Sequence, residues 1–131
     1  MNKMTKFIEL KAVFKRLHGS DGCMWDKKQT HKTLIPYLKE ESDEFMDALK
    51  RGDSSHMKEE LGDILLQVMF HAQIASKNGK FDVEDVIDHL IKKLKRRHPH
   101  IFGKTKVRSV EDIVANWGRI KAQEKKAGRG R

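Results

Sequence analysis

The stretch ESDEFMDALKRGDSSHMKEELGD, residues 41–63, decides the fold predicted for this chain. Four acidic residues lie symmetrically about Gly52 within this stretch: Glu41, Glu44, Glu60 and Asp63. The two acids on each side are three residues apart, so on a helix they share one face. If the chain reverses at Gly52 as an antiparallel helical hairpin, Glu41 faces Asp63 and Glu44 faces Glu60. The stretch therefore predicts two helices that gather four carboxylates.

Four carboxylates at one level predict a metal site. Like charges in a poorly solvated place disfavour ionisation, so the cluster is unfavourable unless cations lie among the acids. Mg²⁺ is a hard cation that takes oxygen ligands of this kind, and Mn²⁺ can take its place. The alternative is a solvated acidic face, which we expect for the neighbouring Asp43 and Glu59.

The surroundings of the acids favour the metal site. The alternating spacing of four and three residues that marks the core side of an amphipathic helix runs through Leu34, Leu38, Glu41, Phe45 and Ala48. Glu41 therefore occupies a position where an apolar residue is expected. After Asp63, residues 64–72 are apolar nearly all round the helix, which predicts a buried element.

The whole chain is predicted to be all-α, with no strand pattern and no internal repeat. We expect a four-helix-type bundle in one domain over residues 1–131, ordered over about 4–126 with a flexible tail at 127–131. A loop over 20–29 and a proline turn near 99 interrupt the helices. The predicted helices cover residues 4–18, 30–51, 54–77, 82–98 and 109–126. Pro36 implies either a helix that begins near Ile35 or a kink.

Charge and cysteine content narrow the function classes. The net charge of +9 is uneven, because residues 92–131 hold 14 basic and 3 acidic residues. A basic segment beside an acidic hairpin suggests a bound polyanion, and a nucleic-acid surface is the competing interpretation. The single Cys23 excludes an internal disulfide and fits a reducing, cytoplasmic location. No apolar run approaches the roughly 20 residues that span a membrane.

Several motifs in order along the chain resemble the MazG family of nucleotide pyrophosphohydrolases. The four-acid pattern is one of them, and the others are Asp21-Gly22-Cys23-Met24-Trp25-Asp26 with Gln29-Thr30-His31, Arg96-Arg97-His98-Pro99-His100-Ile101-Phe102-Gly103, and Asn116-Trp117 through Lys121. The resemblance covers about residues 7–126. One departure is Met24, where the family usually has proline.

The resemblance implies hydrolysis of a nucleoside triphosphate between the α and β phosphates, giving the monophosphate and pyrophosphate. It implies Mg²⁺ held by the four acids and assembly as a homodimer or a dimer of dimers. A carboxylate in such a cluster can orient or deprotonate a water molecule, and we expect Glu41 to be this base. Phosphoryl transfer depends mainly on positioning and charge stabilisation, so no side-chain nucleophile is required.

The resemblance also implies a set of substrate-binding residues. Those expected to hold the triphosphate are Lys93, Arg97, Trp117 and Lys121. An Arg clamps phosphate in a bidentate manner and a Lys acts as a point charge. Trp25 and Asp26 are expected to contact the base or ribose, although a tryptophan that plugs the end of the bundle is the alternative.

Three other functions remain open at this stage. A basic nucleic-acid-binding protein would use residues 92–131, but only Phe102 and Trp117 could stack on bases there. A pyrophosphohydrolase for a non-standard nucleotide would have the same acids. An inactive structural or regulatory bundle would have no reason to keep all four.

Overall fold

The computed structural model describes residues 4–128, and these residues contain helices and no strand. The helices are α1 (Met4–Leu17), α2 (Met24–Lys28), α3 (Ile35–Arg51), α4 (Ser54–Lys77), α5 (Val83–Arg97), α6 (Pro99–Phe102) and α7 (Val110–Lys126). The chain divides into two compact units, Met1–Val83 and Glu84–Arg131. The all-α prediction is confirmed, whereas one domain over residues 1–131 stays a prediction.

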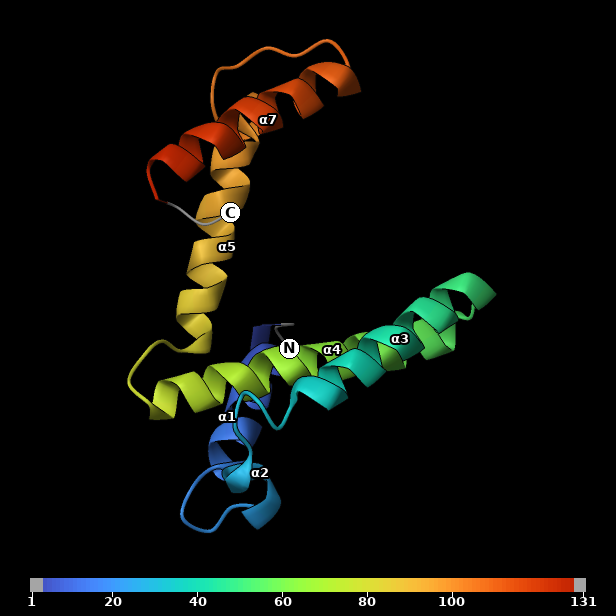
Figure 1. The fold of residues 1–131 in the computed structure, drawn as a ribbon, viewed down its shortest axis with the longest axis vertical. Coiled ribbons are helices and arrows are strands. Elements are labelled where there is room, and N and C mark those ends of the chain that lie inside the picture. The colour runs from blue at the N-terminus through green and yellow to red at the C-terminus, as the bar shows by residue number, and fades with distance from the viewer. Residues whose placement is uncertain (1–3, 129–131) are drawn as a thin grey trace. The chain divides into compact units, whose positions relative to one another are not determined.

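The predicted hairpin is present in the first unit. Helices α3 and α4 lie side by side, cyan and green in Figure 1, and the chain reverses between them at Gly52. Gly52 has a φ of 67°, a left-handed conformation that glycine adopts without steric cost. Asp53 then caps α4, because its side chain accepts a hydrogen bond from the backbone N–H of His56. Local chemistry at two adjacent residues thus sets the turn.

The core of the first unit forms where α1 packs on α4 and the chain enters α3. Its buried members are Phe14, Leu34, Met69, Phe70 and Ile74. The prediction that the apolar run of residues 64–72 on α4 is buried is wrong for part of this run in the single chain, because Leu65, Leu66 and Val68 remain exposed. Only α1 and α3 pack extensively on α4 among the described helices, and two neighbours cover only part of a helix surface.

The expected loop over 20–29 differs from the prediction, because it contains the short helix α2. The second helix begins at Ile35, which confirms the first of the two alternatives that Pro36 implied. Before it, Thr30 and Thr33 exchange side-chain-to-backbone hydrogen bonds that form a turn. Pro36 therefore lies in the first turn of α3, where its missing N–H has no cost. Of the expected flexible tail, residues 129–131 lie outside the described part, and Gly128 follows the end of α7.

In the second unit, α5 and α7 are joined by a buried ion triad. Glu124 on α7 is 3% exposed and accepts hydrogen bonds from Arg96 Nε at 2.6 Å and Arg97 Nη2 at 2.8 Å. These bonds, first from Arg97 and then from Arg96, lower the pKa of Glu124 to about 2. The carboxylate is therefore a charged anchor between the two helices.

The low pKa of Glu124 predicts an acid-sensitive second unit. The folded carboxyl titrates near 2 and the unfolded one near 4.5, so its stabilisation is complete above 4.5 and is lost as the pH falls toward 2. We expect Glu124→Gln to lower the free energy of unfolding at pH 7 and to flatten its dependence on pH below 4.5. Urea denaturation between pH 7 and 2.5 measures both, with Glu111→Gln on the exposed start of α7 as control. An unchanged acid profile would contradict the anchor.

No helix among residues 4–128 is both long enough and apolar enough to cross a membrane.

Candidate active site

The hairpin brings three of the four predicted acids together. Glu41 on α3 and Glu60 and Asp63 on α4 each place a carboxylate oxygen within 4.8 Å of the others. Glu60 is 4% exposed, and Glu41 and Asp63 are partly buried. Along the same stripe, Ala48 on α3 and Leu34 just before it are buried, whereas Leu38 is exposed and Phe45 is partly buried like Glu41.

Two oxygens of this acid cluster have no hydrogen-bond partner among the described residues. They are Oε2 of Glu41 and Oε2 of Glu60, and both are buried. Burial of a carboxylate oxygen without a hydrogen-bond donor or a cation lowers the stability of the folded protein by an amount on the order of kcal/mol. The donor set, made only of carboxylate oxygens, is what a hard divalent cation prefers. The residues present therefore fit a divalent metal.

The electrostatics of the cluster also favour a bound divalent metal. The pKa of Glu41 is raised from 4.5 to about 7, mainly because the carboxyl is buried. The hydrogen bond to Glu60 and the negative charges of Asp63 and Glu44 raise it further. The pKa of Glu44 is also raised, mainly by the charge on Glu60. Glu44 is exposed and is not among the three acids whose oxygens meet. It lies at the edge of the cluster, within its electrostatic field.

The raised pKa of Glu41 predicts how stability depends on pH without metal. Between 4.5 and about 7 the folded protein keeps a proton that the unfolded chain has released, so stability falls as the pH rises through this window. Above about 7 the loss is complete. We expect Glu41→Gln to reduce this fall, measured by urea denaturation in EDTA from pH 4.5 to 8.5. The control is Glu40→Gln, because Glu40 is the exposed neighbour on α3; equal slopes in both variants would contradict the prediction.

The loop residues expected to contact the base or ribose lie in the first unit. Trp25 on α2 is half-exposed and packs edge-on against Tyr37 and against the core residue Phe70. Asp26 lines a cavity between the end of α1, α2 and the end of α4. Trp25 therefore packs on the core, whereas Asp26 borders a cavity.

The four residues expected to hold the triphosphate all lie in the second unit. Lys93 is partly buried on α5, and Lys121 is exposed on α7. Arg97 is held by Glu124, as described above. Trp117 packs edge-on against His98, and its indole Nε1 is buried without a partner among the described residues.

Sequence reasoning missed Glu124. The pattern that identified Glu41, an acid at an apolar position of a helical stripe, also applies to Glu124. On α7 this residue continues the apolar stripe of Ile113, Trp117 and Ile120. An acid in a core-facing stripe predicts a buried charge with a partner, and here the partners are the two arginines of α5. The same rule applied along the whole chain would have found it.

Comparison with known proteins places this geometry in a family. The family model described as the MazG nucleotide pyrophosphohydrolase domain matches residues 29–102, which include all four acids. The chain is 51% identical over 119 residues to the nucleoside triphosphate pyrophosphohydrolase/pyrophosphatase MazG of Thermotoga maritima, covering 91% of this chain and 45% of that protein. It is 40% identical over 123 residues to the nucleoside triphosphate pyrophosphohydrolase of Escherichia coli K12, covering 93% of this chain and 47% of that protein.

A further relative and a solved structure agree with these matches. The uncharacterized protein YabN of Bacillus subtilis is 47% identical, covering 92% of this chain and 24% of that protein. The crystal structure of a mazG-related protein from Thermotoga maritima matches with a TM-score of 0.70 and 28% identity, covering 86% of this chain and 96% of that chain. The chain thus spans about a quarter to a half of the length of these curated relatives. The acid cluster, the matched family model and these relatives together show that the chain belongs to the MazG nucleotide pyrophosphohydrolase family.

Proposed function

We propose that this chain hydrolyses nucleoside triphosphates between the α and β phosphates, with Mg²⁺ as cofactor and Mn²⁺ as a possible substitute. The observation that carries the proposal is the meeting of three carboxylates from two helices, with two buried oxygens unpartnered among the described residues. The names of the relatives, which are nucleoside triphosphate pyrophosphohydrolases, support the substrate class.

Glu41, Glu60 and Asp63 would hold the metal, with Glu44 beside them. A bound divalent cation neutralises phosphate charge and lowers the pKa of water. Glu41 is the general base in this proposal, because a carboxylate within the cluster could orient or deprotonate a water molecule there. The water oxygen bonds to phosphorus, the P–O bond of the α–β anhydride breaks, and the products are the monophosphate and pyrophosphate.

The family resemblance also supports a proposal for the residues that contact the substrate. We assign Lys93, Arg97 and Lys121 to the phosphates and Trp117 to a packing contact with the substrate. Arg97 keeps its Nε and Nη2 on Glu124, so the anchor holds one edge of the guanidinium and leaves Nη1 for a phosphate oxygen. Trp25 and Asp26 are assigned to the base or ribose.

Exposed apolar side chains on the hairpin support self-association. Leu61, Leu65 and Val68 recur at helical spacing on α4, and Met46 and Leu49 are exposed on α3. Apolar surface of this kind marks a partner interface, and two-fold self-association is its commonest use. We therefore propose a homodimer or a dimer of dimers. Sedimentation equilibrium at micromolar concentration tests it, and a fully active monomer would contradict it.

A nucleotide panel tests the activity. The protein is incubated with Mg²⁺ and each standard ribo- and deoxyribonucleoside triphosphate, together with oxidised or deaminated analogues. Pyrophosphate and orthophosphate are measured separately. Release of pyrophosphate with the matching monophosphate supports the proposal, and preference for an analogue identifies a non-standard substrate. Orthophosphate alone, or no product with any nucleotide, would contradict it.

A further inference from the structure

A small cavity in the second unit lies between α7 and the chain that precedes it. Its volume is about 240 Å³, and its lining residues are Pro99, Thr105, Asn116, Arg119, Ile120 and Gln123. All six belong to the second unit. A water molecule takes about 30 Å³ of the liquid, and pockets for drug-sized ligands begin at roughly 300 Å³. The cavity therefore has room for a small molecule or ion, but not for a whole nucleotide.

The charge of the lining is positive. Arg119 is the one charged residue among those that line the cavity, and it is exposed, so a solute can reach it. Its Nη2 donates a hydrogen bond to Oδ1 of Asn116. A guanidinium has five N–H donors, so most of them remain for a ligand. The lining residue Thr105 lies between Lys104 and Lys106 in the chain, which adds two positive charges to the same loop.

The polar groups of the lining are well supplied with hydrogen-bond donors. Because arginine can only donate, the Asn116 atom that faces it is the acceptor Oδ1, which leaves the amide N–H groups of Asn116 for another partner. The carbonyl of Pro99 already accepts from the backbone N–H groups of Gly103, at 2.9 Å, and Thr105, at 3.3 Å. The hydroxyl of Thr105 and the amide of Gln123 can also donate. The lining thus favours a ligand that is negatively charged and rich in acceptors.

The cavity lies on a different face of α7 from the residues assigned to the substrate. Asn116, Arg119 and Gln123 follow one another at intervals of three or four residues, so they form one stripe of the helix. Trp117 and Lys121 belong to another stripe, rotated by about 100° because a turn holds 3.6 residues. Neither of these two residues lines the cavity. A ligand in the cavity is therefore distinct from the triphosphate of the proposed reaction.

We propose that this cavity binds a small phosphate anion, inorganic phosphate or pyrophosphate, through the guanidinium of Arg119, with Thr105, Asn116 and Gln123 as further donors. Phosphate oxygens are strong hydrogen-bond acceptors, which matches this lining. Arginine suits the role because its planar fork can donate to two phosphate oxygens at once. The anion site does not depend on the proposed activity, since it uses none of the residues assigned to that reaction.

The test follows individual side chains by NMR. Protein labelled with ¹⁵N is titrated with orthophosphate and with pyrophosphate in EDTA, at an ionic strength held constant with sodium chloride. We expect saturable shifts of the Nε–Hε resonance of Arg119 and of the side-chain amide of Asn116. If the anions shift Arg97 and not Arg119, they bind at the residues assigned to the substrate and the proposal is wrong. The absence of any saturable shift at Arg119 would also overturn it.

A phosphate ester distinguishes the two sources of the same group. Ribose 5-phosphate presents one phosphate attached to a sugar, whereas the cavity is small. We expect it to bind no more tightly than the better of the two inorganic anions. Binding at least tenfold tighter than both would assign the cavity to an organic phosphate and overturn the inorganic assignment.

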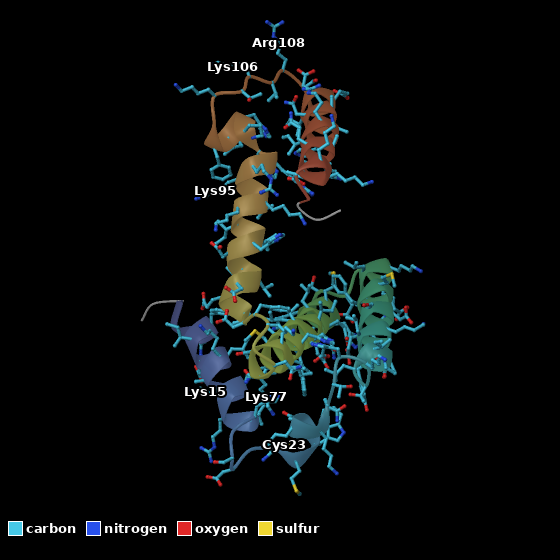
Figure 2. The ribbon with its side chains drawn as sticks, turned by 60° about the vertical axis from the view of Figure 1, so that its left-hand side comes forward. Lys15, Cys23, Lys77, Lys95, Lys106 and Arg108 are labelled. Carbon is cyan, nitrogen blue, oxygen red and sulfur yellow. The ribbon has the colours of Figure 1, made fainter. Side chains whose placement is uncertain are left out.

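A matched pair of arginine variants separates a specific site from general attraction to a basic unit. Arg119→Gln removes the guanidinium at an exposed position, so we expect native circular dichroism and affinity for the preferred anion at least tenfold weaker. Arg119→Lys keeps the charge without the fork and should recover part of this loss. The control is Arg108→Gln, because Arg108 does not line the cavity and projects outward from the loop in Figure 2. Its affinity should stay within about twofold of the parent. Equal losses in Arg119→Gln and Arg108→Gln would overturn the site.

Thermal stability provides a second readout that needs no turnover. A ligand that binds only the folded state raises the melting temperature, so the preferred anion should stabilise the parent and not Arg119→Gln, relative to sodium chloride at the same ionic strength. Equal stabilisation of both proteins would contradict the site. If no nucleotide is hydrolysed while the anion still shifts Arg119, the activity is wrong and the anion site stands. If nucleotides are hydrolysed and Arg119 does not respond, the activity stands and the anion site is wrong.

Discussion

We expect Glu41→Gln to lower the rate of pyrophosphate release by at least ~100-fold, because the change removes both a proposed metal-binding carboxylate and the proposed general base. Asp63→Asn has an effect of similar size through loss of a ligand alone. Both variants stay folded, and their free energy of unfolding in EDTA is equal to or greater than that of the parent, since the amide relieves repulsion within the acid cluster. Initial rates with saturating Mg²⁺ and the preferred nucleotide provide the measurement.

The control for these variants is Glu40→Gln, which changes the charge of α3 equally at an exposed position next to the cluster. Its rate should stay within about twofold of the parent, as surface charges act weakly. If Glu41→Gln and Asp63→Asn both kept parental rates, the acids would not form the active site. A loss confined to Asp63→Asn would keep the metal site and remove Glu41 from the role of base.

We expect removal of metal to stop catalysis completely and to leave the helices intact. Three carboxylates on a hairpin held by its own turn and core do not need a cation to fold, so chelation should change activity and not structure. We expect EDTA to abolish pyrophosphate release while the circular dichroism at 222 nm persists. Addition of Mg²⁺ or Mn²⁺ in excess over the chelator should restore the rate.

Thermal stability adds a second measure of the same site. Mg²⁺ should raise the melting temperature of the parent, because a ligand that binds only the folded state stabilises it, and the rise should vanish in Asp63→Asn. A protein that unfolds in EDTA would indicate a metal coupled to folding instead. Full activity in EDTA would remove the metal from the proposal.

Much of the fold followed from local signals that act over a few residues. Gly52 and Asp53 specify a reversal and a helix start by backbone conformation and capping, and neither depends on distant contacts. The symmetry of the acids about Gly52 correctly predicted that Glu41 and Asp63 would meet, because two helices joined by a tight turn have a defined register, but Glu44 lies outside the three acids whose oxygens meet. The helix cap at Ser109, whose side chain accepts a hydrogen bond from the backbone N–H of Asp112, was also predictable, because capping is a local interaction.

Burial was less predictable, because it depends on which elements happen to cover a surface. The apolar run of residues 64–72 predicted a buried helix, yet Leu65 and Val68 are exposed in the single chain. An apolar side chain favours burial, but the sequence pattern does not show whether the same chain or a partner chain buries it.

The sequence by itself determined the all-α class, the hairpin at Gly52 and the side of each helix on which the acids lie, because helical periodicity and turn chemistry are local properties. Only the tertiary structure decided that Oε2 of Glu41 and of Glu60 are buried without a partner among the described residues, and that Glu124 anchors two arginines from 27 and 28 residues away. These features arise where segments distant in sequence meet, and their burial and electrostatics depend on packing that no local pattern encodes.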